Sequence, residues 1–238
     1  CALVTGVQTC ALPIYPESLV IIGSGFIGLE FAATYAQFGT KVTVVDVIDT
    51  FLPREDEDVA QAVKEQLEAL GVTFNLGVQL KAVHQEGGKA VVEATTREGA
   101  PVAFTTDAVL VATGRRANVQ GLDLDKAGVE LTERGAIKVN EFLQTNVPHI
   151  FAMGDVNGGP QFTFVSLDDF RIVKRFLAGD TTYSTKQRAK FPTATFINPP
   201  LASVGLNEKQ AKEAGIEVKV AKLPAMAIPK AKILGNQV

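Results

Sequence analysis

The most constraining feature of this sequence is a short apolar strand that runs directly into three glycines. Residues 20–28 read V-I-I-G-S-G-F-I-G, a G-x-G-x-x-G fingerprint that starts at Gly23. Gly23 permits a tight turn from strand to helix, Gly25 lets the backbone approach a pyrophosphate, and Gly28 lets the helix pack closely on the strand. The pattern predicts an α/β unit whose helix, residues 27–38, directs its positive N-terminus at phosphate groups.

An acid closes the next predicted strand. Asp46 ends V-T-V-V-D, eighteen positions after Gly28. A carboxylate at the end of the second strand accepts ribose hydroxyls and repels a 2′-phosphate, so the pattern predicts NAD rather than NADP. The alternative is an ordinary α/β crossover, because glycines also recur in turns. The predicted dinucleotide site comprises Gly23, Ser24, Gly25, Phe26, Ile27, Gly28 and Asp46.

Composition excludes several classes of protein. The 238 residues are 46% hydrophobic, enough for a sizeable core, and the net charge of −3 with no dense basic run argues against a nucleic-acid partner. No apolar run of membrane-spanning length and no signal-peptide pattern occurs, which predicts a cytoplasmic protein with no membrane partner. Two cysteines and two isolated histidines predict no metal site.

We expect the first fourteen residues to differ in origin from the rest. Residues 4–14 resemble the translation of a common short-read sequencing adapter, so residues 1–14, with Cys1 and Cys10, are predicted to be an artefact. A natural leader is the alternative.

The remaining segments alternate between helix and strand patterns. Apolar spacing predicts a helix over residues 56–70, and short alternating segments near Val72 and Lys89 predict a small meander. The apolar run 107–115 predicts a strand covered on both faces, ending at Gly114 where backbone approaches a cofactor.

Further patterns follow in the second half of the chain. Residues 150–155 predict another strand ending in glycine and Asp155, followed by a helix through Phe176. The Asp155 carboxylate suits sugar or ribitol hydroxyls, with capping of the next turn as the alternative. After Arg188 we expect a strand, a capped helix from Asn207 to Gly215, and a strand over residues 218–223.

Three stretches together resemble the flavin-dependent pyridine nucleotide-disulfide oxidoreductases. They are the fingerprint, A-T-G-R at residue 112, and T-N-V-P-H-I-F-A-M-G-D-V at residue 145. L-P-R-E-D-E-D at residue 52 and N-P-P-L-A-S-V-G at residue 198 extend the likeness. Residues 158–173 resemble one branch, the bacterial reactive-chlorine-resistance reductases, described as reducing hypothiocyanous acid and copper(II).

The resemblance implies an α/β fold with a Rossmann-like NAD-binding domain, part of a second FAD-binding domain and the start of an α+β dimerisation domain. The implied boundaries are 15–114, 115–187 and 188–238. It also implies a homodimer, and it implies FAD and NAD as cofactors. The flavin ribitol would be held at Gly154 and Asp155, the isoalloxazine would lie against backbone at Gln161, Phe162 and Thr163, and Gly114 would lie near NAD. Glu30 matches the family glutamate that pairs with a lysine beside the flavin.

The sequence also departs from the family pattern. The first FAD-binding glycine motif, the redox-active C-x-x-x-x-C and the lysine partner of Glu30 lie N-terminal to the part seen here, and the family's histidine–glutamate pair lies C-terminal to it. No catalytic residue is therefore predicted in this chain. We expect this chain by itself to bind NADH but not to retain one FAD per chain.

The implied function is electron transfer from NADH through FAD to a cysteine pair, and then to an oxidised small molecule such as hypothiocyanous acid, a disulfide or copper(II). A dihydrolipoamide dehydrogenase-like enzyme is one alternative. A non-catalytic dinucleotide-binding module is the other.

Overall fold

The computed structural model describes residues 15–235, which form two compact units. One unit contains residues 15–114 together with 191–235, and the other is Arg115–Lys190. The predicted adapter segment, residues 1–14, lies outside the described residues. Within residues 15–235, no helix combines the length and apolarity needed to cross a membrane.

A four-stranded parallel sheet organises the first unit, with strand order β3-β2-β1-β7. Its strands are β1 (Ser18–Ile22), β2 (Lys41–Asp46), β3 (Thr73–Leu76) and β7 (Ala108–Val111). Because the strands are parallel, their carboxyl ends meet at one edge of the sheet. The strand order reverses between β1 and β7, which is where ligands bind in sheets of this type.

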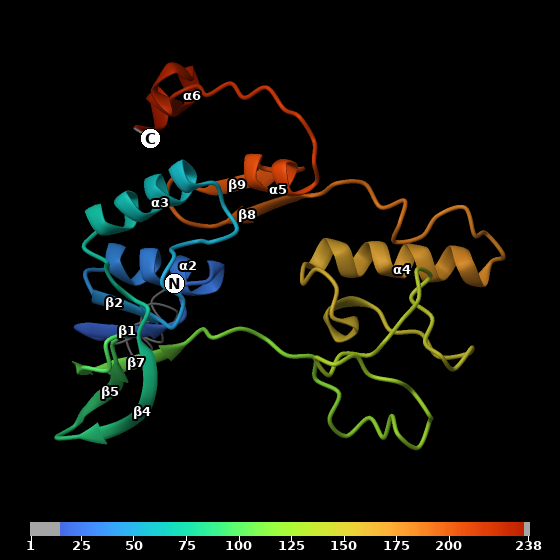
Figure 1. Ribbon diagram of the computed structural model, residues 1–238, viewed down its shortest axis with the longest axis horizontal. Coiled ribbons are helices and arrows are strands. Elements are labelled where there is room, and N and C mark those ends of the chain that lie inside the picture. Colours follow the sequence, from blue (N-terminus) through green and yellow to red (C-terminus); the bar gives the residue numbers. More distant parts are fainter. Residues whose placement is uncertain (1–14, 236–238) are drawn as a thin grey trace, which may run out of the picture. The chain divides into compact units, whose positions relative to one another are not determined.

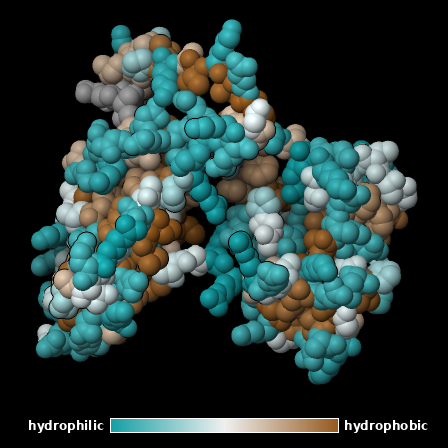
Figure 2. All heavy atoms as spheres, in the orientation of Figure 1, coloured by the Kyte–Doolittle hydropathy of each residue, from teal (hydrophilic) through white to brown (hydrophobic). Residues whose placement is uncertain are grey.

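Two helices cover one face of this sheet (Figure 1). They are α2 (Phe26–Gln37) and α3 (Glu57–Ala69), which confirm the predicted helices to within two residues. Leu19 and Ile21 of β1 point to this face and pack with Leu29 of α2 and Leu67 of α3. The outer face of α3 is hydrophilic, as Figure 2 shows, so α3 buries a single apolar stripe, whereas α2 also exposes the apolar side chain of Phe31.

An antiparallel sheet covers the other face. It consists of β4 (Gln79–Glu86), β5 (Lys89–Thr95) and β6 (Pro101–Thr106), in the order β4-β5-β6. Val20 and Ile22, the alternate residues of β1, pack there with Val92 and Ala94 of β5. The alternation of β1 between two cores explains its unbroken apolarity.

Two predictions about these strands need correction. The segment after Val72 joins the parallel sheet as β3, and the meander instead begins with β4, whose residues are all exposed and carry no alternating pattern. β7 is shorter than predicted, and Val111 at its end is 68% exposed, but the strand is covered on both faces as expected, since Leu110 packs against one core and Val109 against the other. β7 lies at the edge of the described sheet, where one side has no neighbouring strand.

The last part of the chain returns to the first unit. It contains β8 (Pro192–Thr195), β9 (Leu201–Val204), α5 (Glu208–Glu213), a 3-10 turn η2 (Ala225–Ala227) and α6 (Pro229–Leu234). The predicted capping box is confirmed, because Asn207 and Gln210 exchange side-chain to backbone hydrogen bonds. The predicted strand over residues 218–223 is wrong. These residues pair with no strand in the described part of the chain and are exposed.

The second unit is built around α4 (Thr163–Leu177) and a short 3-10 turn, η1 (Gly154–Asn157). The predicted helix through Phe176 is confirmed. The predicted strand over residues 150–155 is wrong, since only Phe151 makes a single bridge, to Gln144. A strand needs a partner along its length, and this unit offers none among the described residues.

Candidate functional site

The fingerprint turn is fixed by backbone contacts. The Gly23 N–H donates to the Val45 carbonyl at 2.9 Å, and Ala112 N–H donates to the Ile22 carbonyl at 2.8 Å. Gly23 has φ +111°, and a Cβ built there would lie 2.4 Å from the Ala112 carbonyl oxygen. Only glycine fits, because β1, β2 and the residue after β7 all converge on this point.

The other two glycines of the fingerprint have different surroundings. A Cβ on Gly28 would lie 2.1 Å from the Gly23 carbonyl oxygen, so Gly28 lets α2 approach the turn. A Cβ on Gly25 would meet nothing within 4 Å. Gly25 is the N-cap of α2 and makes no side-chain cap, so open space lies at the helix N-terminus. That space suits a phosphate, which unpaired N–H groups and the helix dipole attract. Phe26 and Ile27 are 41% and 43% exposed beside it.

Asp46 at the end of β2 contacts the fingerprint directly. Its Oδ2 accepts hydrogen bonds from Ser24 N at 2.6 Å and Ser24 Oγ at 2.7 Å, while Oδ1 accepts from Ile48 N at 3.0 Å. The carboxylate is partly exposed, and each oxygen has two lone pairs, so acceptor capacity remains for a ligand. The structure therefore places Asp46 against the glycine turn, as the spacing predicts.

Gly114 lies two residues beyond the contact between Ala112 and Gly23. It has φ +112°, and a Cβ there would meet nothing within 4 Å. It follows the carboxyl end of β7, so it shares the edge of the sheet with the fingerprint. The structure thus brings Gly114, Asp46 and the fingerprint residues together.

Glu30 has a partner that the sequence did not indicate. Its Oε1 accepts a hydrogen bond at 2.9 Å from the backbone N–H of Phe196, at the end of β8. Glu30 thus contacts a chain segment 166 residues away, within the first unit. The signal for this contact is absent from the local sequence.

In the second unit, Asp155 follows Gly154 at the start of η1. The Asp155 side chain is 48% exposed, and its Oδ2 lies 3.2 Å from Nη1 of Arg115. Arg115 Nη2 also donates to the Gln161 carbonyl at 3.1 Å. One guanidinium therefore brings the predicted flavin residues Asp155 and Gln161 together.

Phe162 and Thr163 lie where Gln161 leads into α4. Phe162 is the N-cap of this helix with extended backbone, and Thr163 is its first residue. The Phe162 and Phe164 rings stack with centroids 5.1 Å apart. The backbone at this junction is thus fixed by helix α4.

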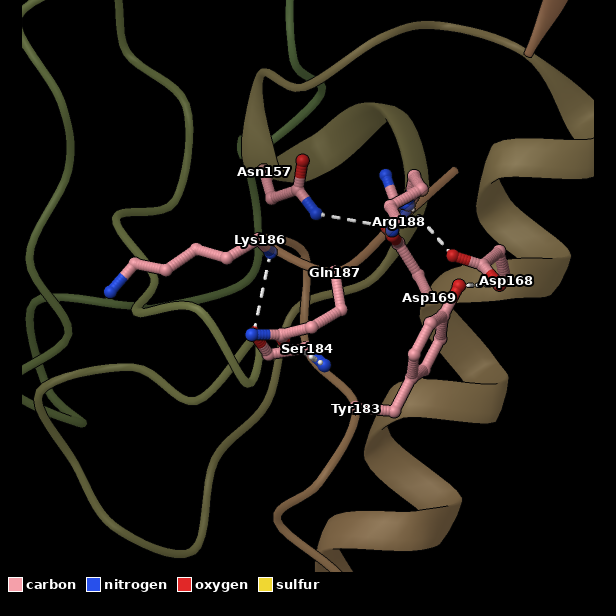
Figure 3. Close-up of polar contacts among 9 residues, drawn as sticks. Asn157, Asp168, Asp169, Tyr183, Ser184, Lys186, Gln187 and Arg188 are labelled. Atoms are coloured by element: carbon pink, nitrogen blue, oxygen red, sulfur yellow. Dashed lines mark hydrogen bonds and ion pairs between the residues drawn. The ribbon is translucent and has the colours of Figure 1, made fainter. Parts of the chain in front are cut away.

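A buried polar network supports the turn that carries Asp155 (Figure 3). Asp169 Oδ2 accepts from Gly154 N at 2.8 Å and from Asn157 Nδ2 at 3.1 Å, and Oδ1 pairs with Arg188. Arg188 Nε also donates to Asp168 Oδ2 at 2.7 Å. Sequence reasoning missed this network. Its one local signal is that Asp169 falls on the buried face of α4, with Val165, Ile172 and Val173.

Burial and charge shift two groups of this network. Burial alone would lower the pKa of Arg188, but its hydrogen bonds to Asp169 and Asp168 raise that pKa above the ordinary value. Burial raises the pKa of Tyr183, and so does the hydrogen bond that its hydroxyl donates to Asp168 at 3.1 Å. Both groups are therefore held in the protonation state that they have at neutral pH.

The two groups of residues belong to different units and have different chemistry. The first offers a helix N-terminus, an open glycine and a ribose acceptor, which fit a dinucleotide. The second offers an exposed carboxylate on a rigid turn, which fits a polyhydroxyl chain.

Comparison with known proteins gives concordant matches. The family profile described as "Pyridine nucleotide-disulphide oxidoreductase" matches residues 3–169, and the profile of its dimerisation domain matches residues 191–237. The chain is 41% identical over 221 residues to the "Probable pyridine nucleotide-disulfide oxidoreductase RclA" of Escherichia coli K12, covering 93% of the chain and 49% of that protein. It is 39% identical over 221 residues to a "Dihydrolipoyl dehydrogenase" of Mycobacterium tuberculosis H37Rv, covering 93% and 47%.

A solved structure agrees with the sequence matches. The Cu(II) complex of "HOCl-induced flavoprotein disulfide reductase RclA" from Escherichia coli superposes with a TM-score of 0.86 and 39% identity, covering 94% of this chain and 49% of that one. The chain spans about half the length of the curated relatives that it matches. The predicted fold class is confirmed: a Rossmann-like NAD-binding domain, part of a FAD-binding domain and the start of a dimerisation domain.

Proposed function

The chain belongs to the pyridine nucleotide-disulphide oxidoreductase family, and from this premise we propose that it supplies the NADH site and one side of the flavin site of an oxidoreductase. Enzymes of this family bind FAD and use NAD(P)H. The proposed reaction carries two electrons from NADH to an oxidised small molecule.

The observation that carries the proposal is the open space at Gly25 beside the Asp46 carboxylate. Gly23 and Gly28 are packed against backbone, whereas Gly25 faces free space at the N-terminus of α2. In the proposed complex the pyrophosphate fills that space and accepts hydrogen bonds from the first N–H groups of α2. Asp46 accepts hydrogen bonds from the adenosine ribose, and Ser24 keeps its carboxylate in place.

On the flavin side, the proposed contacts are the Asp155 carboxylate to ribitol hydroxyls and the backbone of Gln161, Phe162 and Thr163 to the ring. Bound FAD would supply the chemistry of the relay, by accepting a hydride and releasing electrons. Arg115 orients Asp155 by contacting one of its oxygens, and the same guanidinium holds the Gln161 carbonyl. The chain's own residues thus bind and orient the cofactor.

For the oxidant we propose hypothiocyanous acid, a disulfide or copper(II), and for the whole protein a cytoplasmic homodimer. The support is the likeness to RclA, which is described as an HOCl-induced flavoprotein disulfide reductase and is solved as a Cu(II) complex, and the match to the dimerisation domain. A dihydrolipoyl dehydrogenase-like activity is the second candidate, since relatives so named are 39% identical.

The first test is cofactor preference. Two like charges about 4 Å apart near a surface repel by roughly 4 kcal/mol, so we expect at least about tenfold tighter binding of NADH than of NADPH after relaxation. Asp46→Asn should narrow the gap, and it suits the test better than alanine because an amide oxygen can still accept from Ser24. Equal affinities in the wild-type protein would refute the assignment of Asp46.

The second test separates the ligand from the fold. Gly25 has φ −72°, and an alanine Cβ there meets nothing, so Gly25→Ala should leave the free energy of unfolding almost unchanged. NADH affinity should fall at least about tenfold, because the methyl group occupies the space proposed for the pyrophosphate. Gln37→Ala, at the exposed far end of α2, is the control that should change neither quantity. Unchanged NADH affinity in Gly25→Ala would remove the main support for the site.

The third test separates an enzyme from a binding module. The protein at its natural full length should bind one FAD per chain, and NADH should bleach the flavin absorbance. A full-length protein that binds NADH but no flavin would favour the non-catalytic module.

A further inference from the structure

The turn that carries Asp155 lies directly against helix α4. Gly154 has φ +74° and is buried, and a Cβ there would lie 2.8 Å from Ser166 Oγ. Asp169 follows Ser166 by three residues, so both side chains lie on the same side of α4. The backbone of the turn therefore meets the helix at two successive positions.

The environment of Asp169 accepts only a carboxylate. Its three partners, Gly154 N, Asn157 Nδ2 and Arg188 Nη2, are all donors, and they are shared between its two oxygens. The Asp169 side chain is only 3% exposed, so water cannot replace a lost partner. An asparagine would direct its NH2 group at a donor on one side or the other.

Arg188 is in turn held in place. Its side chain is 13% exposed, and it bridges the neighbouring carboxylates Asp168 and Asp169 (Figure 3). The loop before it is closed by Ser184, whose backbone N–H donates to Gln187 Oε1 at 2.9 Å, and by the ion pair between Lys186 and Glu141. Arg188 therefore reaches α4 from a fixed backbone.

The two sides of the turn differ in what they can contact. Gly154 N–H faces the buried Asp169 carboxylate, whereas the next side chain, Asp155, is 48% exposed. Buried ion pairs contribute little net stability compared with apolar packing of the same volume, and fixing one conformation is a better-attested role for them. The network thus fixes the one peptide from which the exposed carboxylate projects.

We propose that Asp169 and Arg188 are positioning residues for the flavin, because together they fix the Gly154 peptide so that the Asp155 carboxylate is preoriented for the ribitol hydroxyls. This inference rests on the proposed function, in which Asp155 contacts FAD. Asn157 belongs to the same device, since it donates to Asp169 and accepts from Gly159 N at 2.8 Å.

The test measures FAD and NADH affinities of the protein at its natural full length, starting from apoprotein. Asp169→Asn should weaken FAD binding at least about tenfold and change the visible spectrum of the bound flavin, while NADH affinity stays within about twofold. Arg188→Lys, which keeps the charge but cannot bridge both carboxylates in the same geometry, should give an intermediate loss. Glu130→Gln, which removes an exposed ion pair with Lys138 in the same unit, should change neither affinity.

Asp155→Asn separates failure of the inference from failure of the proposed function. Weaker FAD binding in both Asp155→Asn and Asp169→Asn, measured well below the apoprotein melting temperature, supports the inference. If FAD binding is weakened in Asp155→Asn but not in Asp169→Asn, the inference is overturned and the proposed function stands. If FAD affinity is unchanged in both variants, the inference and the proposed function are both overturned. If Asp169→Asn does not fold, Arg188→Lys decides by the same criteria.

Discussion

Two glycine turns in this molecule are built alike and held differently. At the fingerprint, a carboxylate accepts from the backbone N–H after Gly23, and at the second turn a carboxylate accepts from the N–H of Gly154. The first turn is also locked by strand pairing through Val45 and Ile22, whereas the second has no sheet beside it among the described residues. Asp46 is partly exposed and Asp169 is buried.

This difference separates the roles of the two carboxylates. Where backbone already fixes the turn, the carboxylate is free to serve a ligand as well. Where side chains must fix the turn, the oxygens of the supporting carboxylate, Asp169, are occupied by hydrogen bonds within the protein. A second carboxylate, Asp155, faces solvent and can contact a ligand. The comparison predicts that the second turn depends on single side chains far more than the first.

The largest effect is expected at the second turn. Arg188→Met removes the partner of a buried carboxylate and should lower the stability of the second unit by about 3–5 kcal/mol. Amide hydrogen exchange of peptides from residues 115–190 should rise, while exchange in 18–111 and NADH affinity stay unchanged. Equal loosening of both units would break the comparison.

The first turn should respond to added volume instead. In Gly28→Ala the methyl group would overlap the Gly23 carbonyl oxygen, which belongs to backbone that cannot move freely. We expect a loss of about 3 kcal/mol in the free energy of unfolding, measured by urea denaturation. A loss below that of Gly25→Ala would contradict the packing described for the fingerprint.

Removal of a side chain at the first turn should cause only a small loss of stability. Ser24→Ala removes the hydrogen bond from Ser24 Oγ to Asp46, but the Ser24 backbone N–H still donates to the same oxygen. The expected loss of stability is about 1 kcal/mol, against 3–5 kcal/mol for Arg188→Met. If Ser24→Ala equals Arg188→Met, side chains hold both turns alike.

The smallest expected effect is on the stability of the first unit at low pH. Hydrogen bonds from Lys89 and Ser18 lower the pKa of Asp107 to about 2 from 3.8. Because the folded-state pKa is lowered, this carboxylate stabilises the first unit above pH 3.8, and the contribution disappears as the pH falls from 3.8 to about 2. Asp107→Asn should flatten the stability profile in that window. An unchanged acid profile would mean that the strand ladder alone joins β1 to β7.

The sequence predicted well wherever one short segment determines the geometry. The spacing of the glycines predicted the close contacts of Gly23 and Gly28, and the distance in sequence from Gly28 to Asp46 predicted the position of Asp46. It failed where pairing is not local: residues 150–155 have strand character but no partner strand, and β4 pairs despite lacking an alternating pattern.

The network around Asp169 was out of reach for a similar reason. Its partners lie at Gly154, Asn157 and Arg188, and no spacing rule connects them. A carboxylate on the apolar face of a predicted helix was the available signal. That signal indicates a buried partner without saying which residue provides it.

Ile197 delays completion of the hydrophobic core of the first unit during synthesis of the chain. It is buried in the same core as Leu19, Leu29 and Val72, and nearby Phe196 bonds to Glu30 across 166 residues. β7 ends at Val111, and at roughly 5–20 residues per second a ribosome needs on the order of 4–17 s to reach Ile197 from there. During that time the early strands and helices are complete but their core lacks its last member, so nascent chains should engage chaperones until the hairpin of β8 and β9 emerges.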